Sequence, residues 1–222
     1  RAVATKDYLM SQLVFKFPFK TIYYEQDYYV SSNNFSAYRL IESWPKWPDK
    51  LVNIFGPKGC GKTHLSNILK KKIKFIKIIK AENITNNLVD EITNYECLII
   101  DDYKKNIEEN LFYSLLNQLK QLNIFLVVNS TTSIKKEKYT LKDLKSRTES
   151  FVDLGIELPS DDLLMVIISK FFSDKQVEVT PKVSEYIIKN VDRSYEKIFK
   201  FIKNVDELSL SSGKSININL IK

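Results

Sequence analysis

The chain has 222 residues, of which 44% are hydrophobic, so it is long enough for one large domain or for one domain with a small appendage. No stretch approaches the roughly 18 uninterrupted apolar residues of a membrane helix. Lys6 and Asp7 interrupt the only apolar run near the N-terminus, so no signal peptide is expected either. The formal net charge of +7 permits contact with nucleic acid or with an acidic protein but requires neither.

The cysteine and histidine content indicates the compartment and limits the kinds of metal site that the protein can have. Cys60 and Cys97 lack the spacing of a disulfide framework, which favours a reducing compartment, and we expect a cytoplasmic protein. The single histidine argues against a metal site built from cysteine and histidine. The lysines are scattered and often alternate with isoleucine, as in residues 70–77, so most of the positive charge is interpreted as solvated surface.

Strands and helices alternate in the first two thirds of the chain. Residues 1–20 form an extension, and a short helix over 34–43 is predicted to end at two prolines, Pro45 and Pro48. Strands are then predicted at 51–55, 75–79, 97–101, 124–128 and near 151–157, and helices at 62–72, about 83–94 and 107–122. Such alternation indicates an α/β fold of three layers (αβα), in which a parallel sheet lies between two layers of helices.

The pattern changes at residues 159–162, after which every predicted element is helical. Ser160 is a predicted N-cap for a helix up to Phe172, and a second helix opens at Pro181. A third runs over 194–210 and ends near Gly213. We therefore predict an αβα domain over 21–158 and a small all-helical domain over 159–222, preceded by the extension over 1–20.

A glycine-rich segment lies directly between the predicted strand 51–55 and the predicted helix 62–72. It reads Gly56, Pro57, Lys58, Gly59, Cys60, Gly61, Lys62, Thr63, the order of a phosphate-binding P-loop. The main-chain N–H groups of such a loop point at the β-phosphate, Lys62 reaches the β- and γ-phosphates, and the Thr63 hydroxyl ligates Mg²⁺. A chance glycine turn before Lys-Thr is the alternative, but the flanking strand and helix favour a nucleotide site.

Two carboxylates, Asp101 and Asp102, end the apolar strand that begins at Cys97. In a P-loop protein the first acid binds Mg²⁺, directly or through water, and the second orients or deprotonates the attacking water. An ordinary strand exit would look the same, but this strand lies about 40 residues after the phosphate loop, with a helix–strand–helix unit between. We predict Asp101 as a metal ligand and Asp102 as catalytic, although Asp102 is one methylene shorter than the glutamate often found there.

Three segments resemble a known family. Residues 59–65 (Gly-Cys-Gly-Lys-Thr-His-Leu), 98–102 and 144–147 (Leu-Lys-Ser-Arg) are similar to the AAA+ core of the bacterial replication initiator DnaA. The shorter DnaA-related regulator Hda, in its α-proteobacterial form, is the nearest likeness, with Trp-Pro-x-Trp-Pro before the first strand and Gln-Leu near the N-terminus. The resemblance covers roughly residues 11–222. It implies an AAA+ domain with a helical lid that binds ADP or ATP with Mg²⁺.

The resemblance also assigns roles to single residues. Arg147 corresponds to an arginine finger, which acts in trans on a neighbour's ATP, whereas sequence alone would favour an ordinary surface arginine. Asn129 and Ser130, after the strand 124–128, correspond to a polar sensor of the γ-phosphate, although turns favour the same residues. The predicted nucleotide contacts outside the loop are His64, in the loop-to-helix motif, and Tyr29, Val30 and Asn34, in the adenine-side segment.

The lid departs from the family pattern at one position. Glu196 stands where the family usually has a sensor arginine, so we expect Arg193 or Lys197 to replace it. DnaA continues beyond its lid into a helix-turn-helix domain, but this sequence ends at Lys222, and sequence-specific DNA binding is not expected.

The N-terminal extension contains a segment similar to the family's sliding-clamp-binding peptide. Gln12, Leu13, Phe15 and Phe17 match a glutamine followed by apolar anchors, which would insert into a groove of the clamp, the β subunit of DNA polymerase III. An edge strand or a segment packed on the core is the alternative reading.

The function expected from these features is regulation of replication initiation. The chain would bind the clamp and present Arg147 to ATP on DnaA. Its own ATPase activity is expected to be weak or partner-dependent. The sequence leaves open whether the chain forms a homo-oligomer. A second hypothesis is an autonomous AAA+ ATPase that acts on nucleic acid, as an initiator or helicase loader. A P-loop metabolite kinase is disfavoured because the chain has few arginines to clamp phosphates.

Overall fold

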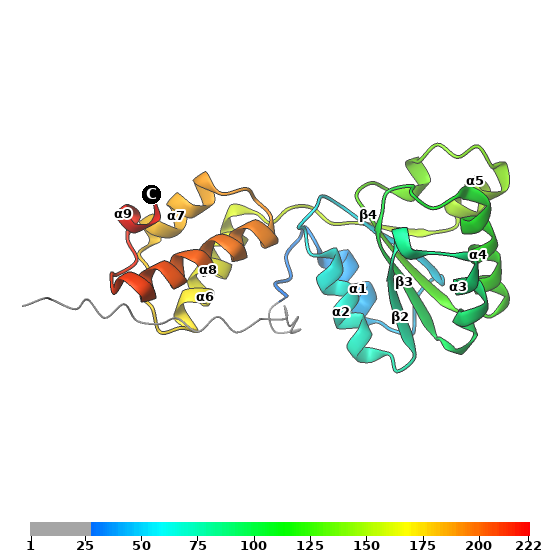
Figure 1. Ribbon diagram of the computed structural model, residues 1–222, viewed down its shortest axis with the longest axis horizontal. Helices are drawn as coiled ribbons and strands as arrows, with labels where there is room; N and C mark the ends of the chain where they lie inside the picture. The colour runs from blue at the N-terminus through cyan, green and yellow to red at the C-terminus, as the bar shows by residue number, and fades with distance from the viewer. Residues whose placement is uncertain (1–27) are drawn as a thin grey trace, which may run out of the picture. The chain divides into compact units, whose positions relative to one another are not determined.

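The computed structural model describes residues 28–222, apart from the side chains of Val89 and Asp90 (Figure 1). The described chain forms two compact units. The sheet unit contains the residues up to Leu163 together with Arg193–Tyr195, and the helical unit contains Leu164–Asp192 and Glu196–Lys222. The clamp-binding-like residues 12–17 lie outside the described residues, and the domain boundary expected at 158/159 stays a prediction.

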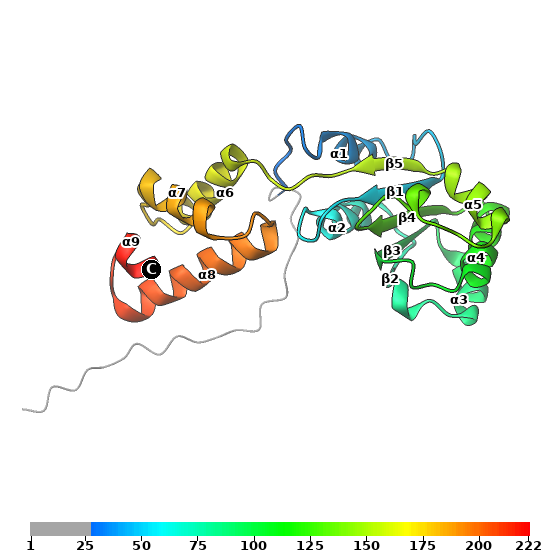
Figure 2. The same ribbon diagram turned by 90° about the horizontal axis from the view of Figure 1, so that it is seen from above.

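The sheet unit is built on five parallel strands. These are β1 (Leu51–Phe55), β2 (Ile76–Lys80), β3 (Cys97–Tyr103), β4 (Phe125–Ser130) and β5 (Val152–Gly155). Their order in the sheet is β2-β3-β4-β1-β5, which can be followed by the labels in Figure 2. The predicted parallel sheet is confirmed.

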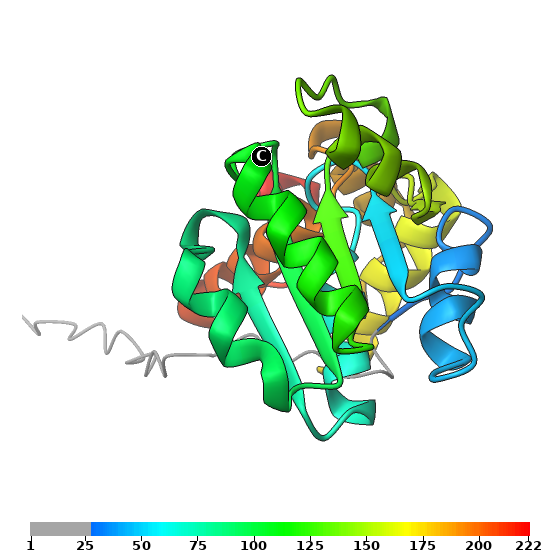
Figure 3. The ribbon, with the colours of Figure 1, turned by 90° about the vertical axis from the view of Figure 1, so that its right-hand side faces the viewer.

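Helices cover both faces of this sheet, as predicted. On one face α1 (Phe35–Glu42) and α2 (Lys62–Lys72) pack against alternate strand residues such as Ile54, Ile99 and Val127. On the other face α3 (Asn86–Glu91), α4 (Glu109–Gln121) and α5 (Lys142–Glu149) pack against the intervening residues, and Figure 3 shows α4 across the front of the sheet. Strands buried on both faces read as continuous apolar runs, which explains Leu98-Ile99-Ile100.

Three elements differ from the sequence-based expectation. The helix expected over 83–94 is reduced to α3 and two flanking 3₁₀ turns, Ala81–Asn83 and Ile92–Asn94, because asparagine and β-branched residues are poor helix formers. The strand expected at 97–101 continues to Tyr103 through an irregularity in its pairing with β4. The strand expected at 124–128 continues through Asn129 and Ser130, which therefore belong to the strand.

The Trp-Pro-x-Trp-Pro segment has a packing role in the sheet unit. The rings of Trp44 and Trp47 lie 4.5 and 5.5 Å from the ring of Phe125, the first residue of β4. The Trp47 Nε1–H donates a hydrogen bond of 2.7 Å to the carbonyl of Leu40 near the end of α1. The two tryptophans thus join the end of α1 to the beginning of β4.

The helical unit contains α7 (Pro181–Asn190), α9 (Ile218–Ile221) and, apart from their first residues, α6 (Asp161–Ser173) and α8 (Tyr195–Ser212). The helices α6, α7 and α8 were predicted. Asn217 caps the unpredicted α9, since its side chain accepts from the main-chain N–H groups of Asn219 and Leu220. The core of this unit includes Leu164, Ile168, Phe172, Ile187, Ile198 and Ile202. No helix within residues 28–222 is long and apolar enough to cross a membrane.

The packing of α4 gives a stability prediction. Phe112 is 1% exposed, so we expect Phe112→Ala to lower the free energy of unfolding of the sheet unit by about 3–5 kcal/mol, measured by urea denaturation. Phe75→Ala is the matched control, because this side chain is 50% exposed and its loss is expected to change stability by no more than about 0.5 kcal/mol. Equal effects of the two substitutions would contradict the packing described.

Candidate phosphate-binding site

The phosphate loop, residues 56–63, adopts a backbone that requires its glycines. Gly59 and Gly61 have φ angles of 80° and 105°, in the left-handed region that favours glycine. A Cβ on Gly56 would lie 2.1 Å from the main-chain oxygen of Ile156, so no larger residue fits there without a shift. The chain turns sharply out of β1 and enters α2 at Lys62, with the positive end of the helix dipole at the loop.

Lys62 lies over the phosphate loop. Its Nζ donates hydrogen bonds to the main-chain oxygens of Gly56 (2.6 Å) and Pro57 (2.9 Å), and it lies 3.6 Å from the Cys60 Sγ. The ammonium therefore stands above the loop, where it can bind phosphate oxygens in exchange for these carbonyls. The side chain of Lys58, by contrast, is exposed.

Three predicted residues from three elements meet beside the loop. The Thr63 hydroxyl on α2 donates to the Asp101 Oδ2 on β3 at 3.1 Å. The Asn129 Nδ2 on β4 donates to the Asp101 Oδ1 at 2.9 Å and to the Ser66 Oγ on α2 at 2.7 Å. The Asn129 Oδ1 is buried and has no hydrogen-bond partner among the described residues, so it can accept a hydrogen bond from a further group at this site.

Strand geometry explains why these residues meet. Side chains alternate along β3 and β4, which places Asp101 and Asn129 on the face of the sheet that α2 covers. Ile100 pairs with Val128 in the parallel register, so the next residue of each strand lies beside the other at the carboxyl edge. The contact follows from the register of two strands and the position of one helix.

The donor set fits a magnesium ion. A hydroxyl and a carboxylate are hard oxygen ligands, and Mg²⁺ is usually held by one or two carboxylates, substrate phosphates and water. Between residues 28 and 222, no group of three or more His, Cys, Asp or Glu side chains could hold a metal alone. Thr63 and Asp101 would therefore share the ion with phosphate oxygens.

Asp102 lies apart from Asp101. Its φ of 58° coincides with the pairing irregularity of β3, and such a bulge re-aims the side chain. The carboxylate is 57% exposed and forms an ion pair of 3.1 Å with the Lys104 Nζ. The structure thus brings only the first acid to Thr63, and the catalytic role of Asp102 stays a prediction.

Ser130 also faces away from Asp101. Its hydroxyl accepts from the Asn53 Nδ2 at 2.8 Å and donates to the carbonyl of Thr132 at 2.6 Å, on the opposite face of the sheet. Its main-chain oxygen accepts from the Gly56 N–H at 3.2 Å. Ser130 therefore supports the base of the loop, and of the two predicted sensors only Asn129 contacts the acid.

The segment before α1 lies beside the loop through a residue that the sequence did not single out. Tyr28 is 8% exposed, its ring lies 5.1 Å edge-on from His64, and a Cβ on Gly61 would be 3.3 Å from it. Burial raises the pKa of the Tyr28 hydroxyl. No sequence pattern distinguishes Tyr28 from its neighbour Tyr29. The predicted Asn34 shapes this segment, since its Nδ2 donates to the Tyr29 carbonyl at 2.8 Å.

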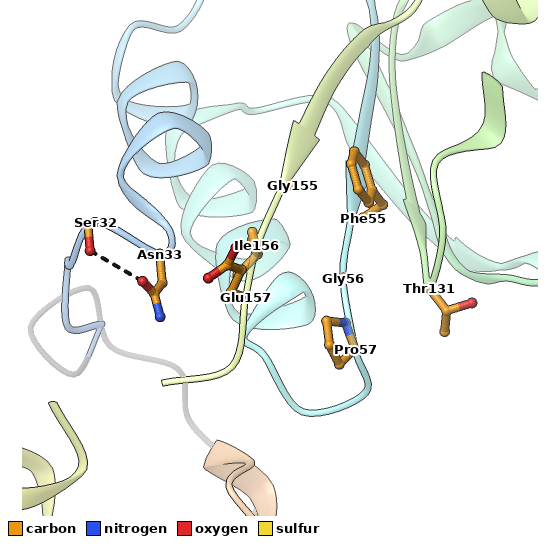
Figure 4. A pocket seen from close by; sticks show the side chains of 9 residues that line it. All are labelled: Ser32, Asn33, Phe55, Gly56, Pro57, Thr131, Gly155, Ile156 and Glu157. Carbon is orange, nitrogen blue, oxygen red and sulfur yellow. Dashed lines mark hydrogen bonds between the residues drawn. The ribbon is translucent and has the colours of Figure 1, made fainter. Parts of the chain in front are cut away.

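A cavity of about 500 Å³ lies beside the first residues of the phosphate loop (Figure 4). Its walls come from the residues before α1, the first residues of the loop, and the chain that follows β4 and β5. They are Ser32, Asn33, Phe55, Gly56, Pro57, Thr131, Gly155, Ile156 and Glu157. Of these, sequence reasoning had assigned only Gly56 and Pro57, while the predicted Val30 is 41% exposed.

Residues 193–195 contact the loop from within the sheet unit. The Tyr195 N–H donates to the Gly59 carbonyl at 3.0 Å. Arg193, the predicted substitute sensor, instead forms an ion pair of 3.1 Å with Asp161, so its guanidinium is engaged elsewhere. Burial raises the pKa of the Tyr195 hydroxyl to about 12, and it also raises the pKa of the Cys60 thiol against the opposing effect of Lys62.

Arg147 lies in a separate pocket of about 250 Å³ between α4 and α5. Its lining is Tyr113, Asp143, Ser146, Arg147 and Ser150, none of which belongs to the phosphate loop. The Arg147 Nε donates to the Asn117 Oδ1 at 3.1 Å. The structure does not bring Arg147 to the nucleotide residues of its own chain, as a residue acting in trans requires.

Comparisons with solved structures show which folds this chain resembles. Domain III of DnaA from Thermotoga maritima superposes with a TM-score of 0.72, at 20% identity, over 92% of this chain and 96% of that domain. A structure of DnaA bound to AMPPCP and single-stranded DNA superposes with a TM-score of 0.69, at 21% identity, over 83% of this chain and 64% of the other. The fold is that of an AAA+ P-loop protein.

Sequence comparisons extend the similarity. DnaA from Buchnera aphidicola subsp. Baizongia pistaciae is 27% identical over 95% of this chain. The chain spans about half the length of the curated relatives that it matches, 52% in this case. A family model described as RNA helicase matches residues 52–143 of the AAA+ fold, a range that contains the phosphate loop and the acidic strand β3. The glycine-rich loop followed by Lys-Thr is a feature of P-loop proteins in general.

The position of Lys62 generates a binding prediction. We expect Lys62→Ala to weaken binding of ADP and ATP by roughly 10- to 150-fold, since hydrogen bonds to charged groups contribute about 1.5–3 kcal/mol. Isothermal titration calorimetry measures this change. Lys58→Ala is the matched control, because it changes an exposed side chain in the same loop and is expected to leave affinity unaltered. Equal losses in both variants would show that net charge, and not the position of Lys62, determines binding.

Proposed function

We propose that this chain is an adenine-nucleotide-binding AAA+ regulator of chromosomal replication initiation. It binds the sliding clamp and promotes hydrolysis of ATP on the DnaA initiator. The observation that carries the proposal is the meeting of Thr63, Asp101 and Asn129 beside a glycine loop, in a fold similar to that of DnaA domain III. A DnaA structure with AMPPCP, an ATP analogue, supports an adenine nucleotide as the ligand.

Different residues of the site are assigned to the phosphates and to the metal ion. The loop N–H groups and Lys62 bind the phosphates, and Asn129 keeps the Asp101 carboxylate oriented toward Thr63. Mg²⁺ held by Thr63 and Asp101 would neutralise charge on the phosphate oxygens. Asp102, exposed and paired with Lys104, is poorly placed as a base, which supports weak hydrolysis by the chain itself.

The action on DnaA is assigned to Arg147. Its pocket is separate from the phosphate loop, and its guanidinium forms no ion pair with any residue from 28 to 222. A guanidinium whose terminal nitrogens form no ion pair within the described part of its own chain can approach the γ-phosphate of ATP on another molecule and stabilise the charge that develops there. This is the part that an arginine finger plays in trans.

Removal of this guanidinium tests the proposal. We expect the Arg147→Ala variant to bind nucleotide normally. It is expected to lower the stimulated rate of ATP hydrolysis on DnaA roughly 10³-fold, or to the rate measured without the chain. Hydrolysis is followed with DnaA preloaded with labelled ATP, in the presence of DNA-loaded clamp. Arg39→Ala, which removes an exposed arginine on α1, is the control and is expected to stimulate fully. Undiminished stimulation by Arg147→Ala would reject the proposed function.

Clamp binding is assigned to Gln12, Leu13, Phe15 and Phe17, on the support of their sequence pattern alone. We expect Gln12→Ala to weaken binding of the chain to immobilised clamp about tenfold. The variant loses the hydrogen bond of the glutamine amide in the groove, which contributes about 1.4 kcal/mol to the binding free energy. Lys16→Ala is the control, since Lys16 lies in the same segment but is neither the glutamine nor one of the apolar anchors of the pattern. Equal retention of both variants and the intact chain would remove these residues from the interface.

A second candidate is an autonomous AAA+ ATPase that acts on nucleic acid. It is favoured by the family model described as RNA helicase, by the net charge of +7 and by the single-stranded DNA in the DnaA structure. The two candidates differ in their ligands. Failure of the intact chain to bind the clamp, together with tight and steeply salt-dependent binding of single strands, would favour the second candidate.

A further inference from the structure

The hydrogen bonding of Arg147 is unusually selective. A guanidinium carries five N–H donors, and in Arg147 the Nε–H is the one that bonds, to the Asn117 Oδ1 at 3.1 Å. Its two terminal nitrogens make no hydrogen bond or ion pair with the residues that the structure describes. The pair of terminal nitrogens forms the fork that binds two oxygens of a phosphate, so the group is held by the atom that a bidentate contact does not need.

The two backbones that carry this hydrogen bond are both fixed. Helix α4 buries Leu115, Leu116 and Leu119 in the core, while α5 buries Leu144. The Glu109 carboxylate accepts from the N–H groups of Thr140 and Leu141 at 2.9 and 2.7 Å, which ties the beginning of α5 to the first turn of α4. The distance between positions 117 and 147 is therefore set by packing.

The chemistry of position 117 fits the same role. Asparagine is a poor residue for a helix interior, yet Asn117 lies in the middle of the 13-residue α4. It follows Tyr113 by one turn, so both side chains lie on the helix face that borders the Arg147 pocket. The other lining residues are the Ser146 and Ser150 hydroxyls and one carboxylate, Asp143, which forms no ion pair with Arg147.

We infer that Asn117 is a positioning residue for Arg147. It holds the guanidinium through Nε, so that the terminal nitrogens are presented outward before the partner's nucleotide arrives. An arginine without this contact samples many rotamers. The entropy cost of ordering its side chain would then add to the activation free energy of hydrolysis. The inference rests on the proposed action of Arg147 in trans and names the residue that prepares it.

Two substitutions of similar size separate positioning from simple packing. Asn117→Leu removes the acceptor oxygen, and Asn117→Asp keeps an oxygen at the same place. We expect Asn117→Leu to lower the maximal stimulated hydrolysis rate on DnaA about tenfold, with the half-saturating concentration of the chain unchanged. Asn117→Asp is expected to stay within about threefold of the intact chain, because the Nε hydrogen bond survives.

A double-mutant cycle supplies the decisive comparison. In an Arg147→Ala background, Asn117→Leu is expected to have no further effect, since the group that it positions is gone. A further loss in that background, equal losses in Asn117→Leu and Asn117→Asp, or full stimulation by Asn117→Leu would each overturn the inference. If Arg147→Ala itself stimulates fully, the proposed function fails and the inference falls with it, so the two failures are distinguishable.

A spectroscopic measurement checks the contact without any partner. The chain has four arginines, so the Arg147 Nε–H resonance can be assigned by its absence from Arg147→Ala. We expect this proton to exchange slowly in the intact chain and in Asn117→Asp, and rapidly in Asn117→Leu at an unchanged melting temperature. Rapid exchange in the intact chain would overturn the inference even if the Asn117→Leu variant failed to fold.

Discussion

The hydrogen bond between the Thr63 hydroxyl and the Asp101 carboxylate joins the two chemical motifs of this chain, which lie 38 residues apart. It requires that α2 begins directly after the glycine turn and that β3 lies second in the sheet, with its carboxyl end at the loop. Asn129 then bonds the second oxygen of Asp101, which orients the carboxylate from β4. The proposed phosphate and Mg²⁺ sites both depend on this one junction of a helix and two strands.

The elements with strong local signals could be predicted from the sequence. The bounds of β1 and α2 match because glycines at positions that need a left-handed backbone separate them. The parallel sheet and its helical cover follow from the alternation of the elements. The helix predicted around α3 is longer than the observed one. Asparagines and β-branched residues there lower the helix propensity without disturbing the helical spacing of the apolar residues.

In the candidate site, the sequence predicted the positions of those residues that lie at the carboxyl ends of parallel strands. Asp101 and Asn129 meet because parallel strands end at one edge, whereas the separation of Asp102 depends on a bulge that no local pattern signals. Tyr28 and Asn117 were missed for a related reason. Each acts through a contact with a residue distant in sequence, His64 and Arg147, and neither stands in a motif.

The contact between the phosphate loop and residue 194 limits how this protein can evolve. A Cβ on Gly59 would come within 2.5 Å of the Ser194 Cβ, so the two residues share a volume that admits only one side chain. A larger residue at position 59 would require the backbone near position 194 to move, and it would also have to adopt the left-handed backbone of Gly59, whose φ is 80°. In related sequences that keep this contact and this backbone, position 59 is therefore expected to stay glycine whichever residue stands at position 194.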